Sequence, residues 1–126
     1  MQELEPAETE VTWNDQQMIN KFGRANLRYH ELLSDLKGKQ TELEDLKEAE
    51  NEILVSDEEY VKYRIGEIYV SVPQSEAEEM IGKEAEKVEQ QTQLISKEID
   101  ALKKIMAELK VQLYGRFGKS INLEED

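Results

Sequence analysis

The stretch YRIGEIYVSV, residues 63–72, constrains the fold of this 126-residue chain more than any other segment. Apolar and polar residues alternate on both sides of Gly66-Glu67, which is the pattern of half-buried strands. Gly in the first central position suits a two-residue type II′ turn, because that position needs a positive φ. Pro73 closes the second strand, since it cannot donate to a ladder. The sequence therefore predicts a β-hairpin at about residues 60–73, with one apolar face made of Val61, Tyr63, Ile65, Ile68, Val70 and Val72.

Two apolar seams of nearly equal length flank the hairpin. Each advances in alternating steps of four and three residues, as in coiled-coil heptads. The first runs from Met18 to Ile53 and the second from Ile81 to Leu113. Because two long helices joined by a tight hairpin can return side by side, we expect an antiparallel two-helix coiled coil, mainly α with a small β part.

Local signals set the expected ends of the helices. Thr12 with Asp15, and Ser75 with Glu78, have the spacing of capping boxes. Glycines near residue 117 suit a helix end. We expect helices at about residues 12–57 and 75–117, within one domain at residues 12–118. Residues 1–11 are predicted to form a flexible acidic tail and residues 119–126 a short C-terminal tail.

The seams can pair in two nearby alignments. One places Lys39 opposite Thr92, and the other places Lys39 opposite Ile99. We favour the first, because facing two polar residues costs less desolvation than stranding a charge in an apolar layer. Gly38 lies beside this polar layer, so we expect the coiled coil to be weakest there. The same alignment pairs Phe22 with Leu109, Ala25 with Met106 and Leu32 with Ile99.

Composition argues against several classes of function. The chain carries 29 acidic and 16 basic residues, a net charge of -13, which disfavours nucleic acids and anionic membranes as partners. It has no Cys, so neither disulfides nor thiolate metal sites are expected. No secretory signal and no membrane span is evident, which predicts a soluble protein of the cytoplasm, or also of the nucleus. A charged fraction of 36% with 6% aromatics favours long helices and an elongated protein.

No group of residues has the arrangement of a catalytic site. The segment from Gly115 to Ser120 hints at a phosphate loop, but its spacer is two residues where four are needed. His30, the single histidine, falls outside the seam, and the sequence gives no support for a ligand or catalytic role there. We therefore expect no enzyme activity, no cofactor and no metal.

The hairpin alone predicts assembly with other chains. An isolated two-stranded hairpin is marginal in water, and both of its edges expose unpaired backbone groups. Its apolar face is best explained as the inside of a sheet or barrel shared between subunits.

Several segments resemble one known family. They are the hairpin YxIGEIYV at residues 63–70, the following Ser75-x-x-Glu78, and the end LKVQLYGRFG at residues 109–118 with INLE at 121–124. These segments are similar to β-type subunits of prefoldin, and residues 11–22 fit the same family. The likeness covers nearly the whole chain except its first ten residues.

This resemblance implies a heterohexamer of two α-type and four β-type subunits. In that family the hairpins form a double β-barrel body from which coiled-coil arms extend. The arms capture non-native proteins, notably actin and tubulin, and pass them to the cytosolic group II chaperonin without nucleotide. A structural coiled-coil adaptor that bridges folded proteins is the alternative.

The resemblance also implies that the free helix ends touch unfolded clients. Candidate residues are Trp13, Met18, Ile19, Phe22, Leu113, Tyr114, Phe117, Ile121 and Leu123. Met18, Phe22 and Leu113 belong to the seam and are expected to be core first. Trp13, Ile19, Tyr114 and Phe117 lie outside or beyond it. For these four, client contact and stapling of the helix ends both stay open.

Overall fold

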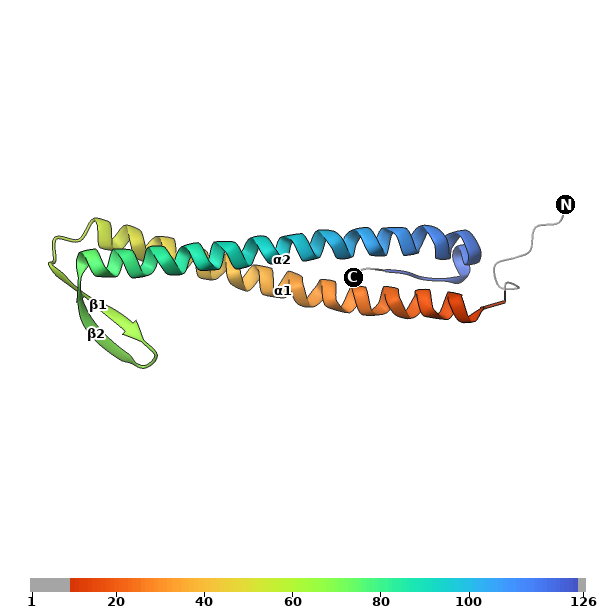
Figure 1. Ribbon diagram of the computed structural model, residues 1–126, viewed down its shortest axis with the longest axis horizontal. Coiled ribbons are helices and arrows are strands. Elements are labelled where there is room, and N and C mark those ends of the chain that lie inside the picture. Colours follow the sequence, from red (N-terminus) through yellow and green to blue (C-terminus); the bar gives the residue numbers. More distant parts are fainter. Residues whose placement is uncertain (1–9, 125–126) are drawn as a thin grey trace. The chain divides into compact units, whose positions relative to one another are not determined.

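The computed structural model describes residues 10–124 and contains two long helices joined by a β-hairpin (Figure 1). The elements are α1 (Trp13–Leu54), β1 (Tyr60–Ile65), β2 (Ile68–Pro73), α2 (Gln74–Phe117) and the short 3₁₀ turn η2 (Gly118–Ser120). The predicted fold class, mainly helical with one hairpin between the helices, is confirmed. Most of the predicted acidic tail, residues 1–9, lies outside the described residues.

A reciprocal capping box starts α1. The Thr12 backbone N–H donates to Asp15 Oδ2 at 2.9 Å, and the Asp15 N–H donates to Thr12 Oγ1 at 3.1 Å. These bonds satisfy donors that the first turn of a helix leaves without intrahelical partners.

The other end of α1 comes earlier than the sequence indicated. The helix ends at Leu54, three residues before the expected boundary near 57. Asp57 and two glutamates follow, and negative charge is unfavourable at the negative end of the helix dipole. The carbonyl of Ile53 accepts hydrogen bonds from the Ser56 N–H at 3.2 Å and from Gln74 Nε2 at 2.6 Å, and the second bond ties the end of α1 to the start of α2.

The boundaries of α2 are set by Pro73 and Gly118. The helix begins at Gln74, so Ser75 lies inside its first turn, and among the described residues Ser75 makes no capping hydrogen bond. The expected second capping box is therefore wrong, because an N-cap at Ser75 needs a helix that begins at Glu76, and α2 begins two residues earlier. Gly118, with φ of +55°, adopts the left-handed conformation that ends helices.

The hairpin has the predicted register. Val61 pairs with Val72 and Ile65 pairs with Ile68, so the apolar residues lie on one face. Gly66 has φ of +62°, whereas no described residue other than glycine has a positive φ. A type I′ turn would need positive φ at Glu67 as well, so the turn fits type II′.

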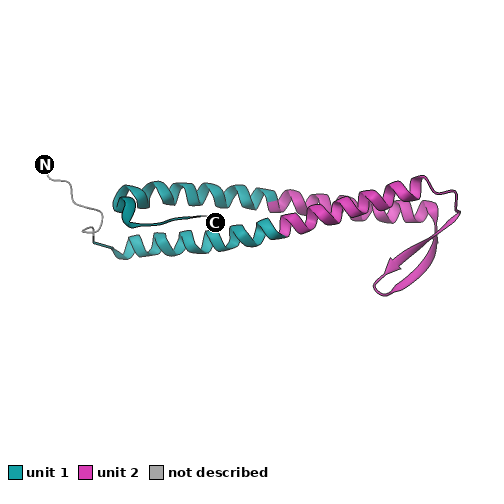
Figure 2. Cartoon of the chain, turned by 180° about the vertical axis from the view of Figure 1, so that it is seen from behind, with its two compact units in different colours: residues 1–34, 96–126 teal, residues 35–95 magenta. Residues whose placement is uncertain are grey.

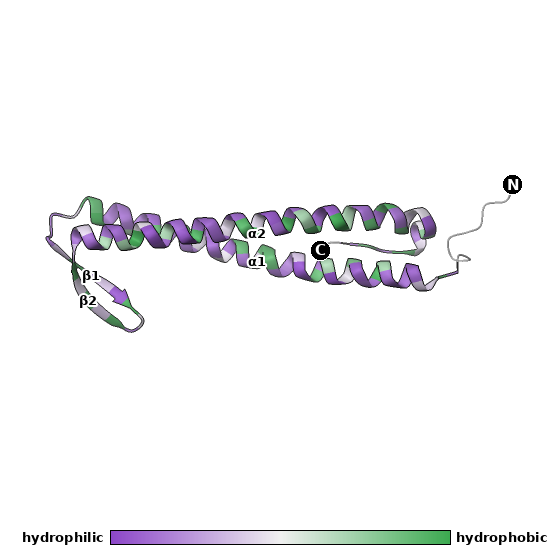
Figure 3. Cartoon of the chain, viewed as in Figure 1, coloured by the Kyte–Doolittle hydropathy of each residue, from purple (hydrophilic) through white to green (hydrophobic). Residues whose placement is uncertain are grey.

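The chain divides into two compact units (Figure 2). The terminal unit, as described, comprises residues 10–34 and 96–124, and the hairpin unit comprises residues 35–95. Each has its own apolar core, and Figure 3 shows apolar residues interspersed among the hydrophilic ones along both helices. The terminal core contains Phe22, Ala25, Met106, Leu109, Leu113, Phe117 and Leu123, and the hairpin core contains Ile53, Ala77 and Ile81.

Contacts in the terminal unit fit the favoured alignment of the seams. That alignment puts Arg28 level with Lys103 of α2, and Lys103 is about one helical turn from Glu98 on the same helix. The structure agrees, because Arg28 Nε lies 3.1 Å from Glu98 Oε1. Tyr29 lies beneath the ammonium of Lys103, 6.0 Å from ring centroid to Nζ. The rejected alignment would carry Arg28 three turns past Glu98, beyond the reach of its side chain.

Candidate protein-binding surfaces

The hairpin presents an apolar face that the chain covers only in part. Val61, Tyr63 and Val72 pack against the hairpin core and are half-buried. Ile65 and Ile68, next to the turn, are 57% and 67% exposed. The outer half of the predicted interface is therefore open in the single chain.

A hollow lies beneath the same hairpin. It measures about 340 Å³ and lies between β1 and the two helices of the hairpin unit. Its apolar lining comes mainly from Leu46, Ala49, Ile53, Val61, Tyr63 and Ile81. An open apolar face beside an apolar hollow is suited to burial against protein.

The nine residues predicted at the helix ends separate into three groups by exposure. Trp13 is 75% exposed and Tyr114 is 39% exposed. Met18, Ile19 and Ile121 are half-buried against the terminal core. The remaining four, Phe22, Leu113, Phe117 and Leu123, are at most 5% exposed.

Phe117 therefore staples the ends of the two helices in the single chain. It was one of the residues for which stapling and client contact were both open, and its side chain lies in the core with Phe22 and Leu113. Trp13 contrasts with it, because most of its surface is free to meet another molecule.

Asp15 and Arg116 form a clasp across these helix ends. The Asp15 side chain is almost fully buried, and its Oδ2 accepts a hydrogen bond from Arg116 Nη2 at 2.6 Å. Burial by itself would raise the pKa of Asp15. The hydrogen bonds from Thr12 and Arg116 outweigh that effect together, and the pKa lies below the ordinary value of 3.8.

The segment after η2 also packs on the terminal unit. The Leu123 side chain is buried in the terminal core, and its backbone N–H donates to Tyr114 Oη at 3.0 Å. Asn26 Nδ2 donates to the carbonyl of Glu124 at 3.2 Å. The predicted C-terminal tail is thus, up to residue 124, a docked segment of this unit.

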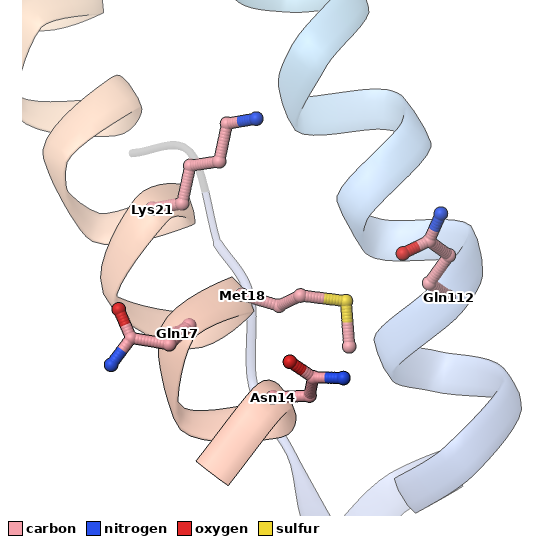
Figure 4. Close-up of a pocket in the computed structure, with 5 residues that line it drawn as sticks. All are labelled: Asn14, Gln17, Met18, Lys21 and Gln112. Carbon is pink, nitrogen blue, oxygen red and sulfur yellow. The ribbon is translucent and has the colours of Figure 1, made fainter.

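An open pocket of about 480 Å³ lies between the start of α1 and the end of α2 (Figure 4). Met18 extends from α1 toward the side of α2 that carries Gln112, and Lys21 lies further along α1. Asn14 and Gln17 complete the lining. A flexible thioether among amides and one cation offers both apolar contact and backbone hydrogen bonding to a peptide.

Sequence reasoning missed the clasp and the docked C-terminal segment. The sequence predicts Asp15 as a capping residue, and no local pattern links it to Arg116. Their meeting depends on the alignment of two helices whose ends are 101 residues apart. For the C-terminal segment, the available signal was the apolar Leu123 among polar residues beyond the helix end.

Across residues 10–124, no group of three or more His, Cys, Asp or Glu is placed to hold a metal ion. Within the same range, neither helix is apolar enough over sufficient length to cross a lipid bilayer.

The fold defines a class of protein in which a single β-hairpin links two long, packed helices. A family model described as "Prefoldin subunit" matches residues 16–120. Prefoldin subunit 4 of Homo sapiens is 33% identical to the chain, over 100% of this chain and 96% of the relative. Probable prefoldin subunit 4 of Dictyostelium discoideum is 41% identical, over 96% of this chain and 92% of the relative. The chain therefore belongs to the prefoldin family.

A solved structure agrees with this assignment at the level of fold. The crystal structure of the prefoldin beta subunit from Thermococcus strain KS-1 matches with a TM-score of 0.77. The match covers 87% of this chain and 97% of that one, at 17% sequence identity. The predicted resemblance to β-type prefoldin subunits is confirmed, and the relatives from Homo sapiens and Dictyostelium discoideum are both subunit 4. Prefoldin is a family of chaperone subunits and not a known enzyme family.

Proposed function

We propose that this chain is one β-type subunit of a heterohexameric prefoldin, a co-chaperone that works without nucleotide. Its partners are two α-type and three further β-type subunits. The hexamer captures non-native proteins such as actin and tubulin, and passes them to the cytosolic group II chaperonin. The cytoplasm is its proposed place of action, with the nucleus as a second compartment.

The open outer half of the hairpin carries the assembly part of this proposal. Ile65 and Ile68 are large apolar residues held in a regular ladder, and each is more than half exposed. Burying a side chain of this size is worth about 1.5 to 3 kcal/mol. Strands of neighbouring subunits would cover this face and continue the sheet from its unpaired edges.

Exposed side chains at the helix ends support the capture of clients. Trp13 and Tyr114 present aromatic surface, and Met18 lines an open pocket beside amide groups. Such a surface accepts many sequences, because it combines flexible apolar contact with hydrogen bonding to any backbone. Several subunits gripping one client would supply avidity from contacts that are individually weak.

Charge supports a contact with the chaperonin. The hairpin unit carries 17 acidic and 7 basic residues, so it would attract a basic surface on a partner. Raising the ionic strength from 50 to 300 mM should weaken association of the hexamer with the chaperonin. If the affinity of the hexamer for the chaperonin does not change with ionic strength, the electrostatic part of the proposal is wrong.

One experiment tests assembly and capture in sequence. The chain is mixed with an α-type subunit and the other β-type subunits, and the mass is measured by light scattering. We expect a hexamer, and we expect it to suppress aggregation of actin diluted from denaturant. A chain that stays alone would overturn the assembly. A hexamer that gives no protection would instead favour the structural adaptor.

A further inference from the structure

The docked C-terminal segment, residues 121–124, occupies a groove of the terminal unit. Beyond η2 the chain turns back and runs between α1 and α2 (Figures 1 and 2). Leu123 inserts into the terminal core and is 5% exposed, while Ile121 packs against the same core. The adjoining Asn122 and Glu124 are exposed. The segment is therefore anchored mainly through one deeply buried leucine.

Two polar side chains hold the backbone around that anchor. Tyr114 Oη accepts the N–H of Leu123 at 3.0 Å, and Asn26 Nδ2 donates to the carbonyl of Glu124 at 3.2 Å. Neither contact depends on which side chain the bound residue carries. The groove thus recognises an extended backbone with one apolar side chain, which is a general way of binding peptides.

The side-chain amide of Asn26 can form a further hydrogen bond. Its Oδ1 is buried, and among the described residues it has no hydrogen-bond partner. An asparagine amide can donate to a backbone carbonyl and accept from a backbone N–H at the same time. A bound strand that offers a backbone N–H next to the carbonyl that Asn26 Nδ2 contacts would satisfy both the donor and the acceptor of the amide. This would be favourable, because a buried acceptor without a hydrogen bond costs free energy.

Charge suits the groove to an acidic peptide. Residues 10–34 and 96–120, which make up the rest of the described terminal unit, carry nine basic and six acidic side chains. The segment they hold continues to the C-terminus as Leu-Glu-Glu-Asp. The hairpin unit has the opposite balance, with 17 acidic and 7 basic residues, so an acidic peptide is less strongly repelled by the part of the chain that holds the segment.

We propose that this groove is an exchangeable peptide site and that the chain's own C-terminal segment is its built-in competitor. The segment fills the groove when no client is held. An extended client stretch, with an apolar side chain followed by acidic residues, displaces it. The proposal rests on the proposed capture of unfolded clients and names the class of segment that this subunit prefers. One buried anchor and two backbone hydrogen bonds make a small interface, which suits rapid exchange.

The first test measures exchange without any client. A variant that ends at Ser120 is compared with the full chain for binding a fluorescent peptide of residues 120–126. We expect the shortened chain to bind the peptide at least about tenfold tighter. In the full chain the C-terminal segment fills the groove most of the time, and the apparent affinity for the peptide falls in proportion to the fraction of open grooves. A peptide with serine in place of Leu123 should not bind. Equal affinity of the two chains for the peptide would overturn the proposal that the C-terminal segment competes for the groove.

Full-length variants guard against misfolding of the shortened chain. Leu123→Ser removes the anchor and should also raise affinity for the peptide, with helical circular dichroism retained. Asn122→Ser changes an exposed neighbour and should bind the peptide as the unchanged chain does. If Leu123→Ser keeps its helicity and gains no peptide binding, the groove is not an exchangeable site.

A reversible cross-link then tests the link to client capture. The chain has no Cys, so Asn26→Cys with Glu124→Cys places a single pair of thiols across the contact. In the hexamer, the oxidised pair should weaken capture of unfolded actin severalfold, and reductant should restore it. Each single Cys variant is the control. Mass spectrometry of the oxidised pair verifies the cross-link before capture is measured.

The outcomes separate the two proposals. If the oxidised and reduced hexamers capture the client equally, while the peptide still exchanges, the competitor role in capture is overturned and the prefoldin function stands. If no hexamer captures any client, the proposed function fails, and the peptide measurement still decides whether the groove exchanges its occupant.

Discussion

Asp15 and Arg116 hold the start of α1 to the end of α2, although 101 residues separate them in the sequence. The same carboxylate accepts a hydrogen bond from the Thr12 N–H and so caps its own helix. Arg116 in turn donates to the backbone carbonyl of Glu10 at 3.2 Å. One buried carboxylate thus serves a helix start and an ion pair across two helices.

Replacing Asp15 with asparagine should lower the thermal stability of the chain at neutral pH. Because the pKa of Asp15 is lower in the folded chain than in the unfolded one, its ionised form stabilises the fold at neutral pH. That contribution is complete above the unfolded pKa near 3.8 and is lost as the pH falls through the lower folded pKa. Melts followed by circular dichroism from pH 7 to pH 2.5 should show Asp15→Asn and the unchanged chain converging in acid.

The control for this prediction is Asp100→Asn, an exposed aspartate on α2. It should melt like the unchanged chain at every pH. A constant gap between Asp15→Asn and the unchanged chain down to pH 2.5 would mean that the carboxylate is not the titrating group.

Leu113→Ala should destabilise the terminal unit by about 2 to 5 kcal/mol, because Leu113 is fully buried and its loss leaves a cavity. Val111→Ala, on the same helix but 75% exposed, should change stability by less than about 0.5 kcal/mol. Urea unfolding of the purified chain measures both. Similar costs for the two variants would argue against the packing of α1 on α2 described here.

Gly38→Ala should stabilise the chain by about 0.5 to 1 kcal/mol. Gly38 lies inside α1, where alanine is the better helix former, and a Cβ there would meet nothing within 4 Å. Hydrogen exchange of the neighbouring amides should slow by the corresponding factor. This also tests the expectation that the coiled coil is weakest beside Lys39.

Gly66→Ala is the matched glycine variant. A Cβ at Gly66 would also meet open space, but its φ of +62° strains any L side chain. We expect Gly66→Ala to destabilise the hairpin by about 1 kcal/mol. If both glycine variants shift stability in the same direction, backbone conformation does not control their effects.

Ile68→Ser should weaken entry into the hexamer while leaving the melting of the isolated chain nearly unchanged. The side chain is 67% exposed in the single chain and would be buried by neighbouring subunits. Losing that burial should weaken assembly roughly 10- to 100-fold. Light scattering of the subunit mixture measures the effect.

Tyr69→Ser is the control for the hairpin, because Tyr69 is 63% exposed on the opposite face and pairs with Arg64. Assembly of Tyr69→Ser should match that of the unchanged chain. If Tyr69→Ser blocks assembly and Ile68→Ser does not, the interface lies on the other face of the hairpin.

Local chemistry in the sequence predicted the elements well. Alternation around Gly66-Glu67 predicts both the register and the turn type, because a two-residue turn with glycine first leaves one regular pairing. Boundaries were less certain where the two elements interact. The end of α1 and the start of α2 are joined by the hydrogen bond from Gln74 to Ile53, and both boundaries differ from the expected positions, 54 in place of about 57 and 74 in place of about 75.

The residues of the candidate site could likewise be predicted only in part. Apolar side chains near the helix ends can be listed from the sequence, but whether each is buried depends on what packs over it. Phe117 and Trp13 have similar sequence settings at opposite ends of the helical region, and one is 5% and the other 75% exposed.

By itself the sequence determined two amphipathic helices, the hairpin between them and its one-sided apolar face. Those features follow from periodicity and turn chemistry, which act between residues near each other in the chain. Only the tertiary structure decided that Asp15 meets Arg116 and that the segment ending in Glu124 lies against Asn26. These contacts join residues about one hundred positions apart, and they exist only once the helices have packed in a single alignment.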